Sequence, residues 1–356
     1  MHIAVGYRWL AYAAGYHLER ALRELGHRVT YVGLPAPGRP GYDSALPLPE
    51  VLAGLPAPVD LYLWIDPAGR YFPPGLEAVP VPTACYLIDV HLGHWREQAA
   101  RFFDAVFIAQ KDYLPAFQAA AGHAQVYWLP LGAALDVHRR LDLTRQYDVG
   151  FVGNQNPAHR ATARARRLAL LARTFTTNDF YRYYPPEAVS QVYSQSRLVF
   201  NTSIAGDVTM RVFEGAACGA LVLTDSTANG LGELFDLGRE IVTFADDADL
   251  LDQVRYYLAH PAEREAIAAA GWRRVQAEHG YTQRMRQLLE TVTAPGFRPA
   301  AALRQAGAAE RRAARRRVLT HLHMLDALFD EAQAAGLDPA RRFLFTAGAW
   351  LRRLLR

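Results

Sequence analysis

Short apolar runs alternate with amphipathic stretches along the chain from its first residues. An apolar run over 3–5 leads into a loop, then an amphipathic stretch over 16–25 that Gly26 can end, and then a second apolar run over 29–32. This order predicts a strand, a helix and a strand, the βαβ unit of a parallel sheet. Further apolar runs predict buried strands over 61–65, 83–88, 105–109 and 125–129.

A polar stretch over residues 136–147 interrupts this alternation, which then restarts. We expect strands over 148–153, 196–201, 221–223 and 241–244, and helices over 160–173, 208–218, 247–260, 262–279 and 281–293. Two alternating series of this kind predict an α/β fold with two Rossmann-like parallel-sheet domains that face a cleft. The expected bounds are 1–135 for the first domain, 136–147 for a linker, 148–293 for the second domain and 294–356 for a basic helical tail.

The composition is typical of two soluble domains. The chain has 356 residues, of which 51% are apolar and 21% charged, and a chain of this length usually divides into two cores. No apolar run reaches the roughly 20 residues of a membrane-spanning helix, and the N-terminus lacks the basic and apolar regions of a signal peptide. We therefore expect a cytoplasmic protein, in which Cys85 and Cys218 are reduced packing residues.

Positive charge is concentrated at the C-terminal end. Residues 297–356 contain twelve Arg and five Asp or Glu, a balance of +7, so the net charge of +4 leaves −3 for residues 1–296. No basic stripe with interleaved aromatic residues crosses the rest of the chain, which argues against a nucleic-acid partner. The tail is also amphipathic, and two interpretations stay open: packing on the protein itself or on a second subunit as a homodimer, and peripheral contact with the inner face of the membrane. Its first apolar face carries Val318, Leu322, Leu325 and Phe329.

The helix over 208–218 carries the most informative pair of side chains. Arg211 and Glu214 are three positions apart, on one face of a helix that is otherwise small and apolar. A carboxylate in such a place needs a partner, and the hydroxyls of a ribose are suitable, while a planar guanidinium suits a diphosphate. An internal salt bridge between the two side chains is the alternative. Gly219 can end the helix before the strand over 221–223.

Loops that follow the strands of a parallel sheet are the places where ligands bind. Gly6, Tyr7 and Arg8 follow the first strand, where the glycine would let a substrate approach the backbone; an ordinary turn is the alternative. Gly153 and Asn154 follow the first strand of the second domain, and backbone amides in such a turn favour an anion. The glycine spacing there is that of neither a dinucleotide fingerprint nor a Walker loop.

A third loop, after the strand over 83–88, carries a candidate catalytic base. Asp89 and His91 are two residues apart, and a carboxylate beside an imidazole fixes its tautomer and raises its basicity. The proton removed would belong to an acceptor hydroxyl. His94, in the same loop, is expected to line the same side of the cleft. A capping or purely structural role for the pair is the alternative. No set of His, Asp and Glu has metal-binding spacing, so we expect no metal site.

Several motifs together resemble a known family. They occur in order over residues 148–153, 199–201, 211–220, 234–241, 267–271 and 279–284. The segment 148–289 resembles the C-terminal domain of group 1 glycosyltransferases with the two-Rossmann-domain GT-B architecture, most closely the branch named after the spore-maturation protein CgeB. Residues 86–91, 104–110 and 128–130 resemble the same branch more loosely.

The resemblance implies a hexosyltransferase that binds a nucleotide-diphosphate sugar mainly on its second domain and an acceptor mainly on its first. Glu214 would bind the ribose hydroxyls, Arg211 the diphosphate, and Thr224 the sugar side of the cleft. The implied donor-binding residues are Gly153, Asn154, Arg160, Asn201, Arg211, Glu214 and Thr224, with Gly6, Tyr7, Arg8 and His94 on the acceptor side. Such enzymes usually need neither a metal nor another cofactor, because helix ends and basic side chains neutralise the leaving diphosphate. The acceptor is left open among a glycan, a lipid-linked molecule and a protein.

One position departs from the family pattern. Many relatives carry a second acid eight residues before the ribose-binding Glu, and here that position is Gly206, with Asp207 beside it. The resemblance therefore leaves the choice between retaining and inverting chemistry open. Two other functions are alternatives: a binding or assembly protein that keeps the fold without turnover, and a nucleotide-sugar epimerase with the same donor pocket.

Overall fold

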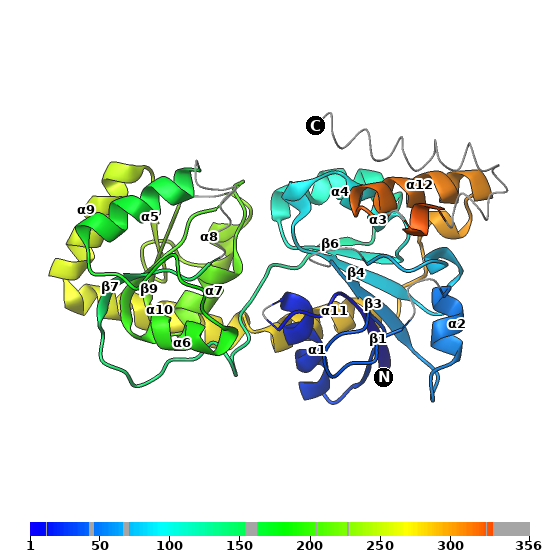
Figure 1. Cartoon of the computed structure of the whole chain (residues 1–356), viewed down its shortest axis with the longest axis horizontal. Coiled ribbons are helices and arrows are strands. Elements are labelled where there is room, and N and C mark those ends of the chain that lie inside the picture. The colour runs from blue at the N-terminus through cyan, green and yellow to red at the C-terminus, as the bar shows by residue number, and fades with distance from the viewer. Residues whose placement is uncertain are drawn as a thin grey trace. The chain divides into compact units, whose positions relative to one another are not determined.

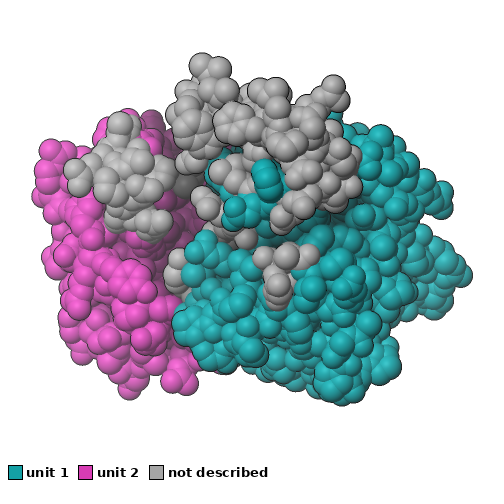
Figure 2. Space-filling view, turned by 45° about the vertical axis from the view of Figure 1, so that its right-hand side comes forward, with its two compact units in different colours: residues 1–109, 113–129, 288–356 teal, residues 110–112, 130–287 magenta. Residues whose placement is uncertain are grey.

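Two compact units make up the chain (Figure 2). The computed structural model describes residues 1–11, 13–42, 46–66, 71–153, 162–203, 205–225, 228–324 and 326–329. Unit 1 comprises Met1–Ala109, Tyr113–Leu129 and Leu288–Arg356, and unit 2 comprises Gln110–Asp112 and Pro130–Gln287. Each unit is built on one parallel sheet. The predicted α/β fold with two Rossmann-like domains is confirmed.

Unit 1 has a six-stranded sheet in the order β2-β1-β3-β4-β5-β6, in which every neighbouring pair is parallel. Figure 1 shows α3, α4 and α12 on one side of this sheet and α1 on the other. All five positions of β3 and of β4 are buried, as expected for parallel strands covered on both faces. The elements are β1 (His2–Gly6), α1 (Ala14–Glu24), β2 (Arg28–Tyr31), α2 (Leu48–Ala53), β3 (Leu61–Ile65), η1 (Leu76–Ala78), β4 (Thr83–Leu87), η2 (Val90–Leu92), α3 (Trp95–Ala100), β5 (Ala105–Ile108), α4 (Leu114–Ala121), β6 (Val126–Trp128), η5 (Ala302–Arg304) and α12 (Ala308–His321). The short η3 (Lys111–Tyr113) lies where the chain passes through unit 2.

The strand order changes direction between β1 and β3. β1 pairs with β2 on one side and with β3 on the other, and the later strands continue away from β3. The loops after β1 and β3 therefore leave the carboxyl edge of the sheet at neighbouring points, where open parallel sheets bind ligands. The first of these loops begins with Tyr7 and the second with Asp66.

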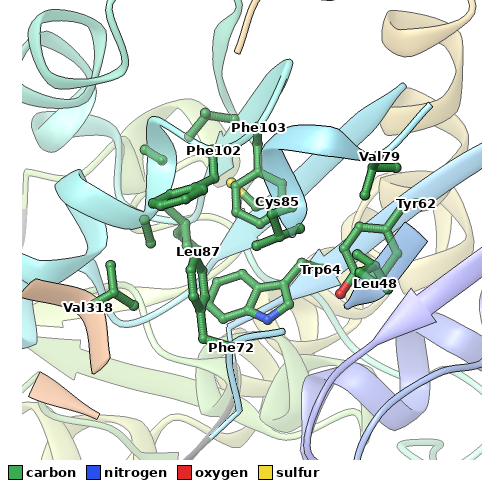
Figure 3. Packing of buried hydrophobic residues seen from close by; sticks show 14 of the residues in the cluster. Leu48, Tyr62, Trp64, Phe72, Val79, Cys85, Leu87, Phe102, Phe103 and Val318 are labelled. Atoms are coloured by element: carbon green, nitrogen blue, oxygen red, sulfur yellow. The ribbon is translucent and has the colours of Figure 1, made fainter. Parts of the chain in front are cut away.

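The core of unit 1 surrounds Trp64 of β3 (Figure 3). Its indole stacks on Phe103, with ring centroids 5.7 Å apart, and meets the ring of Phe72 edge-on at 5.6 Å. Val318 of α12 is fully buried in the same cluster, and Leu322 is buried beside it. The described part of the predicted tail therefore packs on unit 1. Of the other residues on the predicted face, Phe329 is 45% exposed, and Leu325 lies outside the described residues.

A buried carboxylate joins the C-terminal segment to the sheet of unit 1. Asp104, just before β5, accepts hydrogen bonds from the backbone N–H groups of Ala300 and Ala301, each at 2.9 Å. The guanidinium of Arg304 binds it through two nitrogens, at 2.9 and 2.7 Å, and Thr83 donates from its backbone N–H and its hydroxyl. Burial alone would raise the pKa of Asp104, but these hydrogen bonds outweigh burial and hold the pKa below its ordinary value.

Replacing Asp104 with asparagine is expected to lower the free energy of unfolding by about 2–3 kcal/mol at neutral pH, because Arg304 loses its carboxylate partner. The carboxylate's contribution is present above the unfolded-state pKa of about 4 and is lost as the pH falls through the lower folded-state pKa. Urea unfolding at neutral pH and at about pH 3 should show a smaller difference between wild type and D104N in acid. Equal differences at both pH values would contradict the assignment.

Unit 2 has a four-stranded parallel sheet in the order β10-β9-β8-β7. None of the helices in the described part of the chain combines the length and the apolar character needed to cross a membrane. The remaining elements are β7 (Tyr147–Gly150), α5 (Ala163–Thr174), α6 (Pro186–Ser194), β8 (Ser196–Phe200), α7 (Met210–Ala217), β9 (Leu221–Asp225), α8 (Leu231–Leu234), β10 (Val242–Phe244), α9 (Asp247–Ala259), α10 (Pro261–Glu278) and α11 (Tyr281–Val292).

A glycine lets α7 lie close against β8 and β9. A Cβ at Gly215 would be 2.9 Å from Cγ1 of Val199 and 3.0 Å from Cγ2 of Val222, which is too close for a side-chain carbon. The helix ends where the sequence predicts, since Gly219 has a φ of 72°, in the left-handed region that favours glycine. These two glycines fix the helix that carries both candidate donor-binding residues.

Candidate functional site

A polar network lies at the carboxyl edge of the unit 2 sheet. Asn201 follows β8, and its Nδ2 donates to Oγ1 of Thr224 in β9 at 2.8 Å. Its Oδ1 accepts from the hydroxyl of Thr209, the N-cap of α7, at 2.8 Å, and from Nη1 of Arg211 at 2.7 Å. Asn201 and Thr224 are each 1% exposed. Their side chains therefore hold Arg211 in place, which differs from the expectation that Thr224 faces the sugar.

The guanidinium of Arg211 is held by groups of the segment that follows β7. Nε donates to the carbonyl of Val152 at 2.9 Å, and the guanidinium carbon lies 4.2 Å from the ring centroid of Phe151. A Cβ at Gly153 would come within 2.6 Å of Nη2, so glycine is the residue that leaves room for the guanidinium. Among the described residues, no ion pair joins Arg211 to Glu214. The interpretation of this pair as an internal salt bridge is wrong.

Glu214 has a carboxylate that forms no hydrogen bond within the described part of the protein. Its side chain is 15% exposed, and its one ion-pair contact there is to Nε2 of His138, at 3.6 Å, which is too long for a hydrogen bond. Burial, together with the negative charge of Glu214, raises the pKa of the Cys218 thiol to about 12. Burial also raises the pKa of Tyr193, on which Arg211 and Glu214 act in opposite directions. A carboxylate so little exposed is unfavourable without hydrogen-bond donors, so this position suits a ligand with hydroxyl groups.

Arg164 places a second guanidinium near Arg211, and it was not predicted from the sequence. It lies in the first turn of α5, where Nη2 donates to the carbonyl of Thr202 at 3.2 Å and Nε is buried with no partner in the described ranges. Burial is the main cause that lowers the pKa of Arg164 to about 10; the charge of Arg211 lowers it further, and Asp207 and Asp225 oppose the shift. Two cations whose charges act on each other, one of them in the first turn of a helix, favour a bound anion such as a phosphate.

The structure describes only some of the other residues predicted at this edge. Asn154 and Arg160 lie outside the described residues. Gly206, at the position where relatives carry a second acid, has a φ of 77° in the left-handed region, so the backbone conformation there favours glycine. Asp207 is 9% exposed, and its Oδ1 accepts a hydrogen bond from the backbone N–H of Ala205 at 3.4 Å.

In unit 1, the residues after β1 differ from the expectation of an acceptor-binding loop. A Cβ at Gly6 would be 2.2 Å from Oη of Tyr62, so this glycine makes room for a core side chain. Tyr7 is 1% exposed, and its hydroxyl donates to Oε2 of Glu19 in α1 at 2.6 Å. Arg8 is exposed. The prediction that Gly6 and Tyr7 face an acceptor does not agree with this packing, whereas Arg8 is accessible.

The loop after β4 does not form the predicted pair of Asp89 and His91. Nδ1 of His91 is buried and has no hydrogen-bond partner among the residues described, so the carboxylate of Asp89 does not fix its tautomer. The loop is held instead by Asp66, whose Oδ2 accepts from the backbone N–H groups of Ile88 and Asp89, each at 3.3 Å. Asp66 also pairs with Nε of Arg96 at 2.5 Å. This buried ion pair was not predicted, because its partners come from different elements.

His94 lies at the surface of the same loop. Its side chain is 95% exposed, and Nδ1 is 3.0 Å from Oε1 of Glu97. Within the described ranges, no group of three or more His, Cys, Asp or Glu side chains is arranged to hold a metal ion.

A comparison with protein families identifies the segment that carries the unit 2 site. Residues 140–290 match the family described as Glycosyl transferase-like, and this segment contains Arg164, Arg211 and Glu214. This match agrees with the predicted glycosyltransferase class for residues 140–290. A search of the curated proteins gave no significant match.

Solved structures share the fold of both units. A glycosyltransferase from Rickettsia africae ESF-5 has a TM-score of 0.61 and 11% identity, over 82% of this chain and 99% of that one. HepE from Anabaena in complex with UDP-glucose has a TM-score of 0.57 and 12% identity, over 82% and 99%. Sucrose-phosphate synthase from Thermosynechococcus elongatus has a TM-score of 0.55 and 13% identity, over 83% and 100%. Residues 140–290 are thus similar to a glycosyl transferase family, within a chain that has the two-domain GT-B fold.

Proposed function

We propose that this chain transfers a sugar from a UDP-sugar to an acceptor hydroxyl, and that the step needs no metal ion. The observation that carries the proposal is the carboxylate of Glu214, which is 15% exposed and forms no hydrogen bond among the described residues. Glu214 belongs to the same helix as Arg211. The guanidinium of Arg164 lies near that of Arg211. A hydroxyl-binding group and a pair of cations at one carboxyl edge match the two ends of a nucleoside diphosphate.

Glu214 is proposed to bind the ribose. Both carboxylate oxygens are acceptors, and the adjacent 2′- and 3′-hydroxyls of a ribose are two donors with matching spacing. Uracil is proposed as the base because HepE, which shares the fold, was solved with UDP-glucose.

Arg164 and Arg211 are proposed to bind the diphosphate. When the bond between the anomeric carbon and the β-phosphate oxygen breaks, the leaving UDP gains negative charge, which two fixed guanidinium groups and a helix N-terminus stabilise. This is the contribution that a divalent cation makes in metal-dependent transferases. The network of Asn201 and Thr224 orients Arg211 before the substrate arrives.

His91 is proposed as the base that accepts the proton of the acceptor hydroxyl. Its Nδ1 is buried with no hydrogen-bond partner within the described ranges, whereas the residue as a whole is half-buried, so Nε2 is the ring nitrogen proposed to accept the proton. Replacing His91 with alanine is expected to lower kcat about a hundredfold with little change in the dissociation constant for UDP. His27→Ala, a half-buried histidine of the same unit that directly precedes β2 at the other edge of the sheet, is the matched control. Equal kcat values for H91A and wild type would exclude the role.

A binding and turnover assay tests the proposed function. Calorimetric titration with UDP, GDP and dTDP is followed by chromatographic detection of free UDP from UDP-sugars, with and without simple glycan, lipid-linked and peptide acceptors. The proposal expects tight binding of UDP and release of UDP that an acceptor accelerates, in a buffer with a metal chelator. Tight binding without turnover for any acceptor would favour a binding protein that has lost catalysis. No binding of any nucleoside diphosphate would contradict the proposal.

A further inference from the structure

His138 makes the one ion-pair contact of Glu214 within the described part of the chain. It lies in the segment between β6 and β7, is 3% exposed, and places Nε2 3.6 Å from Oε1 of Glu214. From the proposed function we infer that His138 is a positioning residue, which keeps the carboxylate of Glu214 aimed at the ribose.

The hydrogen bonds of His138 fix which ring nitrogen faces Glu214. The backbone N–H of Ala134 donates to Nδ1 at 3.2 Å, so Nδ1 carries a lone pair. In the neutral ring the proton then lies on Nε2, the nitrogen nearer to the carboxylate. The positive end of an N–H dipole therefore lies near Oε1, and protonation of the ring would add a full positive charge in the same place.

The backbone around His138 is held on both sides. Its own N–H donates to the carbonyl of Ala134 at 2.6 Å. Ser190 of α6 donates its hydroxyl to the carbonyl of Val137 at 2.5 Å and accepts from the N–H of Arg139 at 3.2 Å. The imidazole is therefore placed by three backbone contacts that do not involve Glu214, as a group that orients another side chain requires.

The distance of 3.6 Å leaves the carboxylate free to bind a ligand. A shorter contact would occupy Oε1 with a protein donor. Without any contact, the side chain of Glu214 would populate several rotamers. An N–H group whose nitrogen lies at this distance from Oε1 favours one orientation of the carboxylate and still leaves the oxygen lone pairs available for a ligand.

Three variants of His138 and a double-mutant cycle test this role. H138A is expected to raise the dissociation constant for UDP about tenfold, measured by calorimetric titration. H138Q keeps an N–H near the place of Nε2 and should bind UDP within about threefold of wild type, whereas the shorter H138N should resemble H138A. His279→Ala controls for general destabilisation, because it removes another buried histidine of unit 2, one whose Nε2 is bonded to the carbonyl of Leu234.

The cycle separates this inference from the proposed function. Because His138 acts through Glu214, adding H138A to E214A should cause no further loss of affinity. Fully additive effects, or a loss in H279A equal to that in H138A, would show a structural role and overturn the inference. Unchanged affinity in H138A together with weak binding in E214A would also overturn it while leaving the proposed function intact. Unchanged affinity in E214A would instead contradict the proposed ribose site itself.

Discussion

Replacing Glu214 with alanine is expected to weaken UDP binding about thousandfold while the protein stays folded. A hydrogen bond to a charged group contributes about 1.5–3 kcal/mol, so the loss of two such bonds to a ribose corresponds to roughly a hundredfold to ten-thousandfold in affinity. Stability should change little, because this carboxylate has no hydrogen bond to lose among the described residues. Its removal even relieves burial of a charge.

Calorimetric titration with UDP and thermal unfolding without ligand measure the two effects separately. Glu187→Ala is the matched control, because Glu187 belongs to α6 of the same unit and its side chain is exposed. Full affinity in E214A would show that the carboxylate does not contact the nucleotide. Loss of affinity together with a large drop in Tm would instead point to a structural glutamate.

Replacing both Arg164 and Arg211 with methionine is expected to lower kcat/KM for the UDP-sugar about thousandfold. Each guanidinium makes charge-assisted bonds to the diphosphate that strengthen as the leaving group gains charge. The single substitutions should each cost about tenfold to a hundredfold. R164M is the cleaner of the two, because Arg211 also makes structural hydrogen bonds to Val152 and Asn201, whereas Arg164 donates only to the carbonyl of Thr202 in the described ranges.

Comparison of UDP with uridine assigns this loss to the diphosphate. The arginine variants should lose affinity for UDP but keep the weak affinity for uridine, whereas E214A should lose both. Arg166→Met controls for a change of charge on α5, since Arg166 is 65% exposed and pairs with Asp247. Equal losses for UDP and uridine in R164M would contradict the assignment of Arg164 to the phosphates.

The elements of both sheets were predictable because their signals are local. The apolar run over 83–88 became β4 (Thr83–Leu87), and the amphipathic stretch over 208–218 became α7, ended by Gly219 as expected. Buried parallel strands are continuous apolar runs, so few competing assignments existed. Helices α2, α3, α4 and α6 were not predicted. Each has six to nine residues, which is too few to show a clear helical period.

The residues themselves predicted the unit 2 site on α7 and at the turn of Gly153, and the family resemblance added Asn201 and Thr224, which lie in the network around Arg211. Arg211 and Glu214 stood out because both lie on α7, yet the sequence left open whether they pair with each other. Arg164 and His138 were missed, since their roles come from contacts with α7 across long stretches of chain. An arginine in the first turn of the helix after the opening strand was the available signal for Arg164.

The polar residues of unit 1 were harder to interpret, because their hydrogen-bond partners are distant in the sequence. Asp89 and His91 are close in the chain, but the carboxylate that organises their loop is Asp66, which comes from the end of β3. Tyr7 also has an unforeseen partner, Glu19 of α1. Sequence spacing does not reveal such contacts between elements.

A crystal structure of the protein with UDP would show directly whether Glu214 binds the ribose. We expect both carboxylate oxygens of Glu214 to lie about 2.6–3.2 Å from the ribose hydroxyl oxygens, with the guanidinium groups of Arg164 and Arg211 on the phosphates. A structure in which Glu214 bonds to protein groups, with the nucleotide bound elsewhere, would contradict this expectation.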